Sequence, residues 1–119
     1  MNDTATLEPQ VLSRRTSALL VVDPSSMQAE ALRGLRTRVI AQHVREGRRA
    51  IAVCTANEGA GCTFIATNLA IAMAQIGVKT VLVDTDLRGG TVGHVFDCPA
   101  DRPGLGVFLS NDKVRYNDI

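Results

Sequence analysis

Residues 63–76 form a stretch that is apolar on almost every face of a helix, and this stretch constrains the fold most strongly. A helix of this kind must be covered on both sides rather than on one. Short β-rich apolar runs at residues 50–54 and 80–83 flank it, and each is typical of a buried strand. The order strand, glycine-containing loop, helix and strand is a βαβ unit, whose crossover is right-handed. The sequence therefore predicts an α/β fold with a partial parallel sheet flanked by helices.

Composition agrees with this class and excludes several functions. Hydrophobic residues make up 45% of the chain but aromatics only 3%, so Ala, Val, Leu and Ile must supply the core. A net charge of +1 gives no electrostatic footprint for nucleic acid. No apolar run is long enough to span a bilayer, and the polar start has no signal-peptide core. We therefore expect a cytoplasmic protein that does not bind nucleic acid.

The remaining segments divide the chain into three parts. Residues 1–17 are expected to be a flexible lead-in, residues 18–110 the partial domain, and residues 111–119 a polar tail. Within the domain, residues 18–22 are an apolar run that suits a strand or an extended arm. An amphipathic helix is predicted over residues 27–45, started by the capping-box pair Ser25 and Gln28 and stopped at Gly47. Two short helical turns are expected further on, at residues 92–96 and 105–109.

The loop between the first strand and the apolar helix has the small residues of a phosphate-binding loop. Backbone N–H groups can converge on an anion there, and the dipole of the following helix favours negative charge. This predicts a fold of the P-loop NTPase type, with Thr63 offering its hydroxyl to Mg²⁺. The candidate nucleotide-binding residues are Gly59, Ala60, Gly61, Cys62, Thr63 and Phe64.

Cys62 stands where a phosphate-binding loop carries its lysine, directly before Thr63. That lysine bridges the β- and γ-phosphates of ATP and neutralises charge in the transition state. Losing such a contact costs on the order of 2–4 kcal/mol of transition-state stabilisation. Residues 55–63 contain no Lys or Arg that could replace it. By itself, this loop could equally be a glycine-containing turn of some other α/β protein.

Two carboxylates follow the second predicted strand. Asp84 and Asp86 are two residues apart, and residues at that spacing face the same side of a strand. They would lie at the carboxyl edge of the sheet, where open α/β sheets bind their ligands. One could hold Mg²⁺ and the other could act as a catalytic base, so both are candidate catalytic and metal-binding residues. The alternative is that one carboxylate caps the next turn while the other is solvated.

Taken together, these motifs resemble the bacterial tyrosine kinases, which belong to the deviant phosphate-loop ATPases. The resemblance rests on AVCTANEGAGCTFIATNLA (residues 52–70) and GVKTVLVDTDLRGG (residues 77–90), and covers about residues 19–110. It implies ATP and Mg²⁺ as cofactors if nucleotide binding is retained, and otherwise none. It also implies work in exopolysaccharide and capsule synthesis beside a membrane chain-length, or polysaccharide co-polymerase, protein. Such a partner would recruit the chain to the inner membrane.

The predicted helix carries a second family feature. Glu30, Arg33 and Arg36 match the family's Glu-x2-Arg-x2-Arg oligomerisation motif, and their spacing keeps them near one helix stripe. An exposed arginine stripe can pair with carboxylates of a neighbouring copy, so the resemblance implies self-association through this helix. From spacing alone, an ordinary solvated helix face with an internal Glu–Arg pair is the better reading.

Several departures from the family pattern bear on activity. Besides Cys62, Glu58 and Ala60 replace a proline and an acidic residue of the loop. The chain stops before the hydrophobic strand ending in Asp known as Walker B, and its one tyrosine, Tyr116, does not form the family's C-terminal cluster. We therefore expect a degenerate, regulatory or scaffolding member that binds nucleotide weakly or not at all. The alternative is an active ATP-dependent protein-tyrosine kinase with an unusual loop, or a fragment of one.

Overall fold

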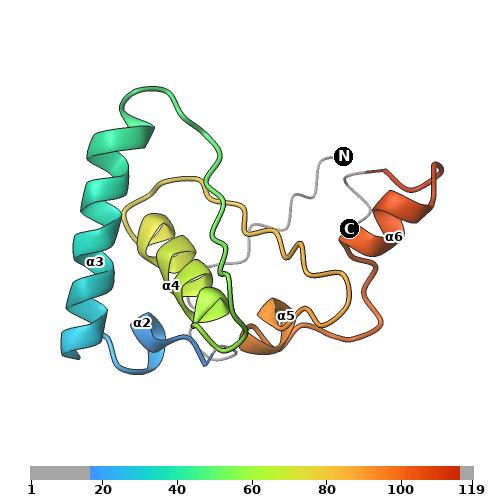
Figure 1. The fold of residues 1–119 in the computed structure, drawn as a ribbon, viewed down its shortest axis with the longest axis horizontal. Coiled ribbons are helices and arrows are strands. Elements are labelled where there is room, and N and C mark those ends of the chain that lie inside the picture. Colours follow the sequence, from blue (N-terminus) through green and yellow to red (C-terminus); the bar gives the residue numbers. More distant parts are fainter. Residues whose placement is uncertain (1–16, 116–119) are drawn as a thin grey trace.

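The computed structural model describes residues 17–115, and their regular structure is entirely helical. Two helices of equal length dominate: α3 (Met27–Val39) and α4 (Cys62–Ala74). Shorter helices are α2 (Leu19–Val22), α5 (Val92–Val95) and α6 (Leu105–Ser110). Figure 1 shows α4 at the centre of the fold, with α3 on one side and α5 and α6 on the other.

The long amphipathic helix is confirmed and begins at Met27 as predicted, but its capping residue differs and its end is irregular. Ser26, not Ser25, caps α3: its hydroxyl accepts a hydrogen bond from the Ala29 N–H at 3.2 Å. The last part of the predicted helix is η1 (Ile40–Val44), one wider π-helical turn. The chain then leaves through Gly47, whose φ of 85° is costly for a residue with a side chain.

A small core lies where α2, α3 and α4 meet. Leu20, Ala29, Leu32 and Ala72 are buried together, and Leu19, Ile65 and Ile71 pack against them. The first predicted element is corrected here, because residues 19–22 form α2 rather than a strand or an arm. The amide side chain of Asn68 holds that turn: its Oδ1 accepts the Leu20 N–H at 3.0 Å, and its Nδ2 donates to the Phe64 carbonyl at 2.8 Å.

The predicted α/β fold is wrong for the described residues. Neither residues 50–54 nor residues 80–83 form a strand, and residues 17–115 contain no sheet. Both segments run as irregular chain and line the same pocket beside α4, and among the described residues no backbone hydrogen bond joins them. A strand is stable only when its N–H and C=O groups pair with a neighbour, and the β-rich composition of these runs cannot supply one.

The prediction that these two segments are buried is also wrong. Ile51 and Val81, which the prediction placed in the interior of a sheet, are 48% and 72% exposed. Cys54 at the end of the first run is exposed as well. The helix predicted to be covered on both sides is covered only in part, since Phe64 is 44% exposed. Along residues 17–115, no helix is both long and apolar enough to cross a membrane.

Candidate nucleotide-binding site

The predicted phosphate-binding residues do gather at the start of α4. Gly59 and Gly61 adopt positive φ angles of 74° and 85°, and Gly61 is the residue at which α4 begins. A side chain at either position would be strained, which explains the two glycines. No side chain caps this helix end, so its first N–H groups stay available. The loop therefore leaves backbone N–H groups without a side-chain partner at the start of α4.

Cys62 is turned into the protein. Its thiol donates a hydrogen bond to the carbonyl oxygen of Val53 at 3.1 Å and is half-buried. This contact ties the start of α4 to the end of the segment before the loop. A thiol that donates in this way supplies no positive charge to a phosphate.

Thr63, the predicted Mg²⁺ ligand, contacts a residue that the sequence did not single out. Its Oγ1 lies 3.1 Å from Oγ1 of Thr91, so one hydroxyl donates to the other. The neighbour of Thr91, Val92, donates its N–H to Oδ2 of Asp84 at 3.2 Å. Through this pair of contacts the structure brings Thr63 and Asp84 into one neighbourhood.

Asp84 organises the loop that follows it. Besides accepting from Val92, its carboxylate accepts the N–H of Asp86 through Oδ1 at 3.1 Å. Gly90 lies so close that a Cβ there would stand 2.6 Å from Oδ2 of Asp84. Two consecutive glycines after an Asp pair were a signal for such a close backbone approach, and the prediction did not use it.

Asp86 caps the same loop from an exposed position. Its Oδ1 accepts the N–H groups of Gly89 at 3.0 Å and of Arg88 at 3.2 Å. These two bonds, with a smaller effect of the Arg88 charge, hold the pKa of Asp86 below its ordinary value of 3.8. The carboxylate is thus ionised at neutral pH, and its hydrogen bonds are to its own loop.

The side chains as arranged do not fit Mg²⁺–ATP. Both predicted metal-binding carboxylates accept hydrogen bonds from the loop backbone, the Thr63 hydroxyl is paired, and the lysine position is a thiol bonded to a carbonyl. Across residues 17–115, no group of three or more His, Cys, Asp or Glu side chains is placed to hold a metal ion. Both carboxylates accept hydrogen bonds from the loop backbone, whereas the alternative had one of them capping the turn and the other solvated.

The three predicted interface residues make contacts within the chain. Arg33 bonds to the Pro24 carbonyl at 2.7 Å and lies 3.4 Å from the carboxylate of Glu30. Arg36 reaches across to α4, where its guanidinium donates to the Ala72 carbonyl at 3.3 Å. Of the three, Glu30 is the most exposed, with 78% of its side chain accessible. Arg36 therefore links α3 to α4 within the chain.

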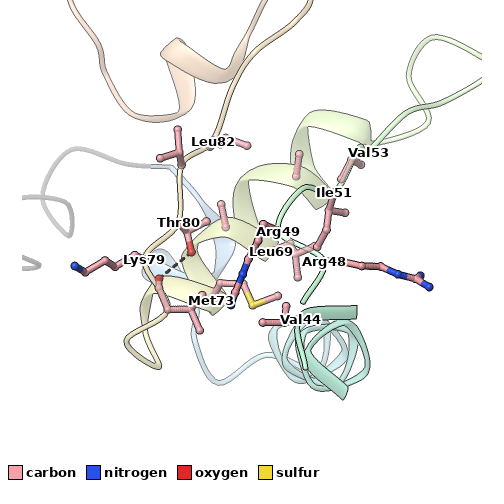
Figure 2. Close-up of a pocket in the computed structure, with 14 residues that line it drawn as sticks. Val44, Arg48, Arg49, Ile51, Val53, Leu69, Met73, Lys79, Thr80 and Leu82 are labelled. Atoms are coloured by element: carbon pink, nitrogen blue, oxygen red, sulfur yellow. Dashed lines mark hydrogen bonds between the residues drawn. The ribbon is translucent and has the colours of Figure 1, made fainter. Parts of the chain in front are cut away.

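A pocket of about 200 Å³ lies elsewhere, beside the middle and end of α4. Its floor is Ala66, Leu69, Ala70 and Met73, and its walls are residues 48–53 and 78–82 (Figure 2). None of the predicted nucleotide-binding or catalytic residues lines it. Its volume is also below the roughly 300–1,000 Å³ of ordinary small-molecule sites. This pocket is therefore separate from the candidate nucleotide site.

In chain order, an irregular segment, a glycine loop and helix α4 are followed by two aspartates that cap a loop. Comparison with curated proteins gives the family. Staphylococcus aureus CapB is 30% identical over 103 residues, which are 86% of this chain and 44% of CapB. The tyrosine-protein kinase YwqD of Bacillus subtilis is 32% identical over 80 residues, or 67% of this chain and 34% of YwqD. The tyrosine-protein kinase CpsD of Streptococcus agalactiae is 31% identical over 98 residues, or 79% of this chain and 42% of CpsD.

The chain belongs to the family of bacterial tyrosine-protein kinases that these relatives represent. It spans less than half the length of each of them. No family model matches the sequence, and no solved structure matches it either.

Proposed function

We propose that the chain is a degenerate member of this family that serves capsule or exopolysaccharide synthesis as a regulatory or scaffolding protein. The observation that carries the proposal is the Cys62 thiol, which replaces a cation and donates to the Val53 carbonyl. A relative from Klebsiella pneumoniae, 32% identical over 109 residues, is named for the cps region, which supports the polysaccharide setting.

Weak or absent nucleotide binding is part of the proposal, and two features of the site support it. Without the loop lysine, the phosphates lose a charged contact that typically contributes about 1.5–3 kcal/mol. Binding Mg²⁺ would also require Asp84 to exchange its bonds to Asp86 and Val92 for metal coordination, which would open the loop. Both effects lower the affinity for Mg²⁺–ATP.

The proposed partner is a membrane chain-length or polysaccharide co-polymerase protein, which would recruit this cytoplasmic chain to the inner membrane. Self-association through α3 is part of the proposal, and it relies on Glu30, whose carboxylate is exposed to a neighbouring copy. Reversing that charge with Glu30→Arg should abolish self-association measured by sedimentation, whereas Gln28→Arg on an exposed position of the same helix should not.

Nucleotide titration tests the central claim. A fluorescent ATP analogue with Mg²⁺ should show no saturable binding to the unaltered chain in the micromolar range. Cys62→Lys restores the charge and should strengthen binding by roughly 10–100-fold, which is the value of one charged contact. Cys54→Lys is the matched control, because it adds the same charge at an exposed cysteine outside the loop. Micromolar, Mg²⁺-dependent binding by the unaltered chain would contradict the proposal.

A second candidate, an active ATP-dependent tyrosine kinase, is favoured by one observation. The uncapped start of α4 and the two positive-φ glycines keep an anion cradle intact despite the missing lysine. A partner would have to supply the compensating cation. ATP hydrolysis or autophosphorylation by the purified chain, lost in Asp84→Ala, would support this candidate over the first.

A further inference from the structure

Two of the three cysteines stand at the two ends of the glycine loop before α4. Cys54 comes directly before residues 55–61, and Cys62 comes directly after them. Both are free thiols, Cys54 exposed and Cys62 partly buried. The residues between them form turns and bends without a helix, so the loop can move while α4 stays in place. A covalent bond between the two sulfurs would close this loop at its base.

The hydrogen bond of Cys62 places its sulfur beside the peptide group that leads into Cys54. Sγ of Cys62 lies 3.1 Å from the carbonyl oxygen of Val53. Standard bond lengths put that oxygen about 2.8 Å from the Cα of Cys54, because both atoms belong to one trans peptide plane. The sulfur of Cys62 therefore lies within about 6 Å of the Cα of Cys54. A disulfide needs Cα atoms about 4.4–6.8 Å apart, which is within reach of a movement of the loop.

The third cysteine occupies a different part of the fold. Cys98 follows α5, and its N–H donates to the Gly93 carbonyl at 2.9 Å. Its thiol is free and exposed, like that of Cys54. Cys98 therefore reports how an exposed thiol of this chain reacts when it does not flank the loop.

We propose that Cys54 and Cys62 form a reversible disulfide that locks the loop. A hydroperoxide oxidises the exposed Cys54 thiol to a sulfenic acid and is itself reduced to the alcohol, or to water when it is hydrogen peroxide. The Cys62 thiolate then attacks the Cys54 sulfur, the S–S bond forms, and the sulfenic oxygen leaves as water. The electrons and protons of the two thiols thus pass to the peroxide.

This bond would change the loop directly. Oxidised Cys62 has no S–H, so its hydrogen bond to the Val53 carbonyl is lost and a covalent link to the next residue replaces it. Smaller thiols such as glutathione reverse the reaction by exchange. In a reducing compartment such disulfides are typically transient and redox-sensing. The proposal does not depend on nucleotide binding or on the role in polysaccharide synthesis.

Peptide mapping tests the bond. The full chain is treated with hydrogen peroxide, remaining thiols are blocked with N-ethylmaleimide, and the chain is digested with trypsin and with a protease that cuts after Glu58, which separates the two cysteines. Mass spectrometry should find the fragments of Cys54 and Cys62 joined, and dithiothreitol should release them. Cys98→Ser should form the same link as the unaltered chain.

Hydrogen exchange tests the lock. Oxidation should slow exchange of the amides of residues 55–61 several-fold, and reduction should restore it. Cys62→Ser should show no such change on oxidation, and its hydroxyl can still donate to the Val53 carbonyl, so this variant keeps the contact at the start of α4. Unchanged far-ultraviolet circular dichroism shows that it has kept its fold.

Three results would overturn the proposal. The first is oxidation of Cys54 to sulfinic acid without a disulfide. The second is a disulfide that joins either loop cysteine to Cys98 or to another copy of the chain instead. The third is a Cys54–Cys62 bond that leaves exchange of the loop amides unchanged, because the bond would then not lock the loop.

Discussion

The loop after Asp84 requires glycine at position 90, because the backbone there passes too close to the Asp84 carboxylate to leave room for a side chain. A Cβ at this position would stand 2.6 Å from Oδ2 of Asp84 and 2.8 Å from the Asp86 carbonyl oxygen. Gly90→Ala should therefore destabilise the chain by about 1–3 kcal/mol, as overpacking does. In Gly89→Ala the nearest atom is a comfortable 3.6 Å away, so this neighbouring change should cost less than about 0.5 kcal/mol. Urea unfolding followed by circular dichroism measures both, and equal effects would show that the close approach does not matter.

The lowered pKa of Asp86 makes the stability of its loop depend on pH, and the sign of the shift gives the direction of that dependence. Because its pKa is lowered in the folded chain, its contribution to stability is present above 3.8 and is lost as pH falls through the lower, folded value. The amide signals of Gly89 and Arg88 should therefore shift together on acidification below about pH 4. Asp86→Asn should remove this titration while Asp84→Asn leaves it in place. A titration of both amides that survives Asp86→Asn would disprove the assignment.

At the level of single residues, sequence reasoning identified the loop positions but not the partners of their side chains. The position of Cys62 in the loop, the two glycines with positive φ and the Asp84/Asp86 pair could all be read from spacing, because local conformation sets them. The partners of these residues could not. That the Cys62 thiol bonds to Val53, and that Thr63 meets Thr91, depends on how distant segments fold back.

At the scale of elements, Asn68 of α4 holds α2 through a hydrogen bond, although the sequence of α4 is otherwise mostly apolar. The residue is 1% exposed and bonds at once to the Leu20 N–H and to the Phe64 carbonyl. Asn68→Ala leaves the buried Leu20 amide unsatisfied, so it should cost about 1–3 kcal/mol in the free energy of unfolding. Asn57→Ala, in the exposed loop before α4, should change it by less than about 0.5 kcal/mol. Comparable losses in the two variants would show that Asn68 does not hold α2.

The elements also show where pattern reasoning works. The helices predicted over residues 27–45 and 63–76 appear as α3 with η1 and as α4, because a helix satisfies its own backbone and local sequence largely determines it. The runs at 50–54 and 80–83 have strand composition, yet a strand needs a neighbour that no local pattern guarantees. The helical turn at residues 19–22 was missed for a related reason, since the distant Asn68 supports it.

Across the whole molecule, stability rests on few side chains. Leu32 is 4% exposed and belongs to the small cluster formed with Leu20, Ala29 and Ala72. Leu32→Ala should cost about 2–5 kcal/mol, a large share of the roughly 5–15 kcal/mol available to a small domain. Leu109→Ala makes the same change at a residue that is 61% exposed and should cost less than about 0.5 kcal/mol. Thermal unfolding distinguishes them, and a Leu32→Ala chain that melts like Leu109→Ala would place the core elsewhere.

The described residues do not test the domain limits and terminal segments that the sequence predicts. Residues 1–16 and 116–119, including Tyr116, lie outside the described residues. The predictions for a flexible lead-in and a polar tail therefore stay predictions.

The central place of α4 decides how the chain can be dissected. Helices α2, α3 and α5 each pack against it (Figure 1). A cut between α3 and α4 separates α3 from the surface that buries Leu32, and a cut after α4 separates α5 from its support. The first cut divides the core, whose buried residues lie between Leu20 and Ala72, so a piece made to isolate the loop would have to keep α2, α3 and α4 together.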